Sequence, residues 1–95
     1  MNNLDLSNFG IQLAAQLDEI AKTLHPKSEE FNVLLWEADI LRAKARNIVH
    51  GDEVLPHLRN SVLLPHCRTG LLSTFPALVE QVRRFYLDYD RQSRA

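Results

Sequence analysis

The stretch from Ser28 to Gly51 constrains the fold more than any other part of the chain, because it carries two apolar stripes at helical spacing. With successive residues placed about 100 degrees apart, one stripe consists of Phe31, Leu34, Ala38, Leu41, Ala45 and Ile48. The other lies on nearly the opposite side and consists of Val33, Trp36, Ile40 and Ala43. The charged residues on the two edges between them are Glu37 and Lys44 on one, and Asp39, Arg42 and Arg46 on the other. A helix that is polar only at its edges must be covered on both faces, either inside its own bundle or by a partner chain.

The ends of this stretch carry the signals of a helix start and a helix stop. Ser28 is a suitable N-cap, and the acidic residues that follow it favour the positive end of a helix. His50 followed by Gly51 is typical of a C-terminus. We therefore expect a helix over 28–50.

A first helix is expected over 5–24. Its apolar seam follows three- and four-residue steps through Leu6, Leu13, Leu17, Ile20 and Leu24. Gly10 falls on the one missing position of that seam. Pro26 ends the helix, because a residue before proline is pushed away from helical angles. The short turn that follows predicts a long antiparallel helical hairpin.

The triplet Leu-Pro-His occurs twice in "LPHLRNSVLLPHC", residues 55–67. Pro56 suits the first turn of a helix, where its missing N–H costs little, and Pro65 cannot continue one. We therefore expect a short third helix over 56–64, with the two histidines beside helix boundaries.

A long fourth helix is expected over 74–91, capped by Ser73 or Thr74. The alternative is a helix that already runs from Leu71 and kinks at Pro76. The fold class is thus all-α: one domain over 1–95, a small helical bundle built on a long antiparallel hairpin plus a short third and a long fourth helix.

Charge and composition exclude several classes of protein. Eleven basic residues against twelve acidic ones give a net charge of -1, which does not favour wholesale binding to nucleic acid or to a membrane. Cys67 is the only cysteine, and no signal peptide or membrane-spanning run is visible, so we expect a cytoplasmic protein. A domain of this size buries a smaller share of its surface on folding than a larger domain does, so association with another chain is one way to stabilise it.

A metal site would have to use His57, His66 and Cys67, with His50 as a fourth ligand. The spacing of these residues matches no recognised zinc arrangement. The three scattered glycines also form no phosphate-binding loop. We therefore expect no metal and no cofactor.

One pattern points to an enzyme. Arg59, the polar Asn60 directly after it, and His66, which is separated from Arg59 by six residues, resemble the Arg-His signature of HEPN-type helical ribonucleases. The resemblance covers eight residues and implies that Arg59 and His66 would contact RNA and assist attack by its 2'-hydroxyl. A pattern this short is expected about once by chance in a chain with eight arginines and four histidines.

A second alternative is a nucleic-acid-binding regulator. Arg42 and Arg46 lie four positions apart and share one side of the predicted helix. Asp39 lies three positions before Arg42 and offsets part of its charge. Without a strongly basic surface or an aromatic stacking platform, these two arginines are weak support for that function.

The function that the sequence favours is non-catalytic protein binding, by a small adaptor, chaperone-like or regulatory subunit. Val33, Trp36 and Ile40 are the predicted apolar anchors, and Arg42 and Arg46 are the charges that would set the register. The expected partner is a protein, in a homo-oligomer or a hetero-complex.

Overall fold

The computed structural model describes residues 2–66 and 74–93. Its described residues contain three α-helices and no strand: α1 over Asn3–Ala21, α2 over Glu29–His50 and α3 over Pro76–Ser93. The prediction of a helical fold is confirmed, whereas the count of four helices is wrong. Cys67, Leu71 and Ser73 lie outside the described residues.

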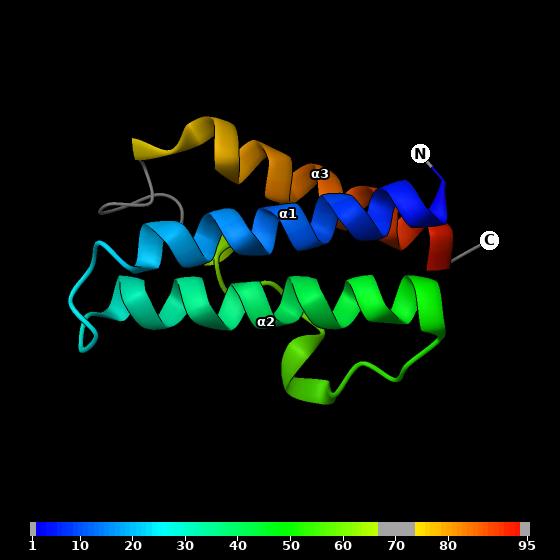
Figure 1. The fold of residues 1–95 in the computed structure, drawn as a ribbon, viewed down its shortest axis with the longest axis horizontal. Coiled ribbons are helices and arrows are strands. Elements are labelled where there is room, and N and C mark those ends of the chain that lie inside the picture. Colours follow the sequence, from blue (N-terminus) through cyan, green and yellow to red (C-terminus); the bar gives the residue numbers. More distant parts are fainter. Residues whose placement is uncertain (1, 67–73, 94–95) are drawn as a thin grey trace.

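The first two helices lie side by side, and the chain runs along them in opposite directions (Figure 1). Asn2 caps α1 by accepting a hydrogen bond from the backbone N–H of Asp5 at 2.8 Å. Ser28 caps α2 by accepting from the backbone N–H of Phe31 at 3.2 Å. Gly51 ends α2 in the left-handed region, at a φ of 72°, which favours glycine.

The expected third helix over 56–64 is replaced by two single 3-10 turns, η1 over Pro56–Leu58 and η2 over Leu64–His66. The cause is a side chain that competes with the helix for hydrogen bonds. Ser61 Oγ accepts from the backbone N–H of Leu64 at 3.1 Å and also donates to the Glu37 carboxylate in α2. These contacts hold the backbone in a turn that a continuous helix does not allow.

The third α-helix crosses behind α1 in Figure 1, and a glycine permits the close approach. A Cβ atom added to Gly10 would lie only 2.7 Å from the ring of Phe85, a fully buried residue of α3. Gly10, the one position of the α1 seam that lacks an apolar side chain, is therefore the place where α3 packs. The core around this contact includes Leu13, Leu17, Leu34, Leu41, Leu63 and Val82.

Both apolar faces of α2 are covered within the chain, except at Trp36, which is partly exposed. One packs along α1, and the other lies against α3 and the segment 51–66, which we call the connecting segment. Leu63 and Val54 of that segment are buried. None of the helices in the part of the chain that the structure describes combines the length and apolar composition needed to cross a bilayer.

Candidate functional site

The three predicted apolar anchors do not form one accessible surface. Ile40 is 0 % exposed and Val33 is also buried, because the connecting segment and α3 cover that side of α2. Trp36 is 46 % exposed, and its indole Nε1 donates to the backbone carbonyl of His57 at 3.1 Å. Only Trp36 of the three is therefore open to a partner.

The two predicted register charges lie on a different side of α2, where the hairpin faces away from α3. Arg42 forms an ion pair with Asp18 of α1 and lies 3.8 Å from Asp39. Arg46 is exposed and forms no ion pair with any residue in the described ranges. This side of the hairpin is a surface in its own right.

We call this surface the outer face and define it by the side chains of α1 and α2 that point away from α3. They are Leu4, Ile11, Ala15, Asp18, Leu35, Asp39, Arg42, Arg46 and Val49. Leu4, Ile11 and Val49 are 61 %, 49 % and 44 % exposed, so large apolar side chains meet solvent at one end of it. Leu35 is also exposed, at the other end.

Two shallow hollows lie along the seam between α1 and α2 on this face. One, of about 220 Å³, is lined by Leu4, Ile11 and Val49 together with Arg46. The other, of about 380 Å³, is lined by Ala15, Asp18, Phe31 and Leu35 among others. The outer face thus presents hollows with mainly apolar linings at both ends, and the charged side chains of Asp39 and Arg42 lie between them.

The most unusual chemistry of the fold lies elsewhere, around the fully buried side chain of Glu37. Its carboxylate accepts from Ser61 Oγ at 2.6 Å, from the Tyr86 hydroxyl at 3.0 Å and from the backbone N–H of Val62 at 3.4 Å. Lys44 is buried beside it, with Nζ 4.3 Å from the centre of the Tyr89 ring. This buried polar cluster joins α2, α3 and the connecting segment.

Burial sets the protonation behaviour of the cluster. It raises the pKa of the Glu37 carboxyl above its ordinary value, and the hydrogen bonds from Ser61, Tyr86 and Val62 and the Lys44 charge oppose part of the shift. It lowers the pKa of Lys44, against the attraction of Asp90 and Glu37. Burial, with Glu37 nearby, also raises the pKa of the Tyr86 hydroxyl.

These groups satisfy one another instead of facing a substrate. No buried side-chain nitrogen or oxygen of the described residues lacks a hydrogen-bond partner. Glu37 is 0 % exposed and Lys44 is 5 % exposed, so neither is presented to solvent. A fully satisfied, closed network of this kind fixes the packing of the elements that contribute to it.

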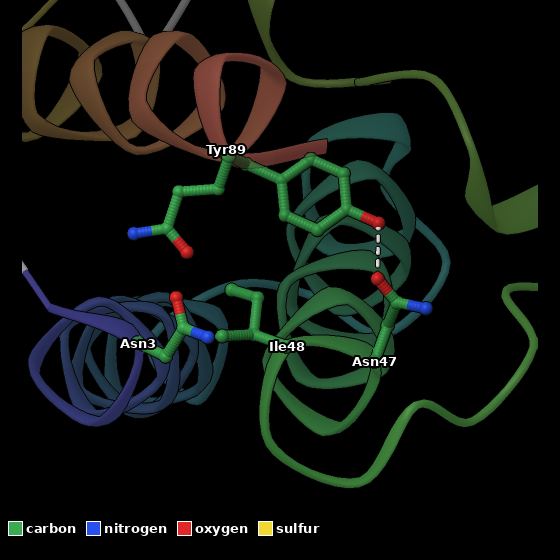
Figure 2. Close-up of a pocket in the computed structure, with 5 residues that line it drawn as sticks. Asn3, Asn47, Ile48 and Tyr89 are labelled. Carbon is green, nitrogen blue, oxygen red and sulfur yellow. Dashed lines mark hydrogen bonds between the residues drawn. The ribbon is translucent and has the colours of Figure 1, made fainter. Parts of the chain in front are cut away.

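A small polar hollow of about 180 Å³ lies where α1 begins and α2 and α3 end (Figure 2). Its lining residues are Asn3, Asn47, Ile48, Tyr89 and Gln92. The Tyr89 hydroxyl donates to Asn47 Oδ1 at 2.8 Å, and the Asn47 amide donates to the carbonyl of Asp52 at 2.9 Å. The Asn47 amide and the Tyr89 hydroxyl are therefore already used to hold the end of α2 to α3 and to the connecting segment.

The residues of the ribonuclease and metal alternatives lie on the connecting segment. Arg59 donates through Nε to the carbonyl of Val54 at 3.4 Å and lies between the two 3-10 turns, outside any α-helix. His66 is the last residue of η2. Within residues 2–66 and 74–93, no group of three or more His, Cys, Asp and Glu side chains is placed to hold a metal ion.

Comparison of the chain with protein-family models, with curated proteins and with solved structures finds no match in any of the three. The geometry of the outer face is therefore the basis on which a function can be proposed.

Proposed function

We propose that this protein is a non-catalytic protein-interaction module, an adaptor or regulatory subunit, that binds its partner through the outer face. The observation that carries the proposal is the exposure of Leu4, Ile11 and Val49 around one hollow of the α1–α2 seam. Apolar side chains that cluster on a surface are a feature of interaction sites, and these three line the same hollow.

The form of the face favours a helical partner. Leu35 and Val49 lie fourteen positions apart on α2, which corresponds to about 21 Å, or nearly four turns. Two apolar hollows at this separation suit a helix that presents apolar side chains at the same spacing. Arg46, which is unpaired within the described residues, offers a charge that fixes the register of such a helix.

Hydroxyl-radical labelling tests the proposal, because it reports protection of a surface whatever molecule covers it. The labelling of Leu4, Ile11 and Val49 is measured in dilute protein, in concentrated protein and in an extract of the cells that make it. Leu55 of the connecting segment and Leu87 of α3 are matched controls, because both are similarly exposed and lie off the outer face.

We expect the three outer-face residues to be protected in at least one of the last two conditions, with the controls unchanged. Equal labelling of the outer face in all three conditions would show that nothing binds there and would refute the proposed function.

A further inference from the structure

The outer face of α2 is self-complementary when the helix is reversed. The midpoint between Asp39 and Arg46 lies within half a residue of the midpoint between Leu35 and Val49. Two copies of α2 that lie antiparallel about this point place Leu35 against the partner's Val49 and Asp39 against the partner's Arg46. Apolar groups thus meet apolar groups, and each carboxylate meets a guanidinium, twice by symmetry.

In the single chain, the side chains of Asp39 and Arg46, which this arrangement pairs, remain accessible to a partner. The side chain of Asp39 is 68 % exposed, and its contact with Arg42 is a long one at 3.8 Å. Arg46 forms no ion pair in the described part of the chain. Arg42 lies nearest the symmetry axis, where its own charge is offset by Asp18.

The same two-fold rotation also brings α1 of one copy against α1 of the other. Ser7 Oγ donates to the carbonyl of Ala45 at 3.1 Å, which fixes the level of α1 along α2. Rotation about the α2 midpoint then brings Leu4 opposite the partner's Ala15. The exposed Leu4 is therefore placed over Ala15, a small residue that lines the larger of the two hollows of the partner.

The area of such a contact fits a weak dimer. The outer face lies in the plane of the two longest dimensions of the molecule, 38 Å by 23 Å. An overlap from Leu35 to His50 is about 22 Å long and two helices, roughly 20 Å, wide. The two copies then bury on the order of 900 Å² in total, which is below the size of a standard stable interface and in the range of weak, transient association.

We infer that the outer face binds a second copy of this chain, with α2 antiparallel to the partner's α2 and Asp39 facing the partner's Arg46. This inference rests on the proposed function and names its partner. Because the contact is small, we expect a dissociation constant on the order of 10 µM.

Charge reversal tests both the occupant and the register. Sedimentation equilibrium of the full chain at 1–500 µM should show a monomer–dimer equilibrium for the wild type (concentrations chosen to bracket an affinity of about 10 µM). D39R and R46D should each weaken self-association about tenfold, because each introduces two like-charge contacts per dimer.

The two variants mixed in equal amounts should associate again. In the mixed dimer one chain presents arginine at both positions and the other presents a carboxylate at both, so both cross-chain contacts are complementary. Recovery to within about threefold of the wild-type affinity supports this register specifically. The matched control is R83D, because Arg83 lies on α3, away from the outer face, and pairs with Glu80 of its own helix at 2.7 Å. It should leave the monomer–dimer equilibrium unchanged.

The outcomes separate the two proposals. A wild type that stays monomeric throughout, or single variants whose mixture does not associate better than either alone, would overturn the second-copy inference. Protection of the outer face only in cell extract would overturn it too, yet would leave the proposed function standing with a different partner. Loss of helical circular dichroism in D39R or R46D would move the same test to D39N and R46Q. Smaller losses are expected for these variants, and their mixture should be partly rescued, because the mixed dimer keeps one Asp39–Arg46 contact.

Discussion

The hydroxyl of Ser61 lies 2.6 Å from the carboxylate of Glu37, and this contact joins the connecting segment to the middle of α2. The same hydroxyl accepts a hydrogen bond from the backbone N–H of Leu64. One side chain thus both shapes the turn that replaces a third helix and attaches it to the bundle.

Replacing Ser61 with alanine should loosen this attachment. We expect a loss of about 1–3 kcal/mol in the free energy of unfolding, because the buried Glu37 carboxylate loses one donor. Hydrogen exchange should quicken at the amides of Val62 and Leu64, which bond to Glu37 and Ser61. Asn60→Ala is the control, since Asn60 is exposed. Equal effects of the two variants would contradict the assigned role of Ser61.

The buried carboxyl of Glu37 should make stability depend on pH. Its pKa in the folded protein is raised above the ordinary value of 4.5, so its contribution to stability is present below that value and is lost as the pH rises through the folded pKa. Glu37→Gln keeps an acceptor and removes the charge. Relative to the wild type, we expect E37Q to gain stability as the pH increases from about 4 to 8.

Urea unfolding of both proteins across that pH range measures the effect. Glu37→Ala, which removes the hydrogen-bonding group as well, should be less stable than E37Q at every pH, by about 1–3 kcal/mol. Parallel pH profiles of the wild type and E37Q would show that Glu37 has the same pKa in the folded and unfolded chain.

The close approach of α3 to α1 can be tested at Gly10. Alanine there meets the ring of Phe85, so we expect Gly10→Ala to cost about 1–3 kcal/mol although alanine favours a helix. Phe85→Leu removes the clashing ring atoms. A double-mutant cycle by thermal unfolding should then show that G10A costs less, or stabilises, in the F85L background. If the effects of the two substitutions on stability were additive, the effect of G10A would not arise from its contact with Phe85.

The two sides of α2 should respond differently to a charge. Ile40→Asp buries a carboxylate in a fully covered position, so we expect a loss of about 4 kcal/mol or more and an unfolded or molten chain. Leu35→Asp lies on the outer face and should keep the helical circular dichroism and a cooperative melt. A folded I40D protein would mean that the connecting segment does not cover Ile40 in solution.

The limits of α2 follow from local chemistry that is readable in the sequence. Ser28 supplies the capping oxygen, and Gly51 supplies a residue that adopts positive φ without strain. Both signals act within one turn of the helix end, so they can be recognised without the tertiary fold.

The errors arise where a distant residue decides the structure. Glu37 has the sequence position of an edge charge, yet it is buried because Ser61 and Tyr86, 24 and 49 positions away, supply its donors. The predicted third helix fails for the same reason. No periodic pattern within either segment reveals such a pairing.

The outer face is not predicted from the sequence, because it is formed by the edges of two helices that only the tertiary fold brings together. Leu4 and Ile11 lie seven positions apart, and Leu35 and Val49 lie fourteen apart, so each pair does fall on one side of its helix. The signal becomes visible only when the edges of two packed helices are considered together. Trp36, the largest apolar side chain of α2, lies about a quarter turn away from the outer face, so a prediction based on it points to a different side of the helix.

The buried polar cluster also sets an order of events for the newly made chain. Helices α1 and α2 adjoin in sequence and make the most extensive contact, so we expect their hairpin to form early, with Glu37 still hydrated and ionised. The connecting segment and α3 then dock and enclose the carboxylate. Because burial raises the pKa of the enclosed carboxyl above that of the hydrated one, this last docking step should become more favourable as the pH falls.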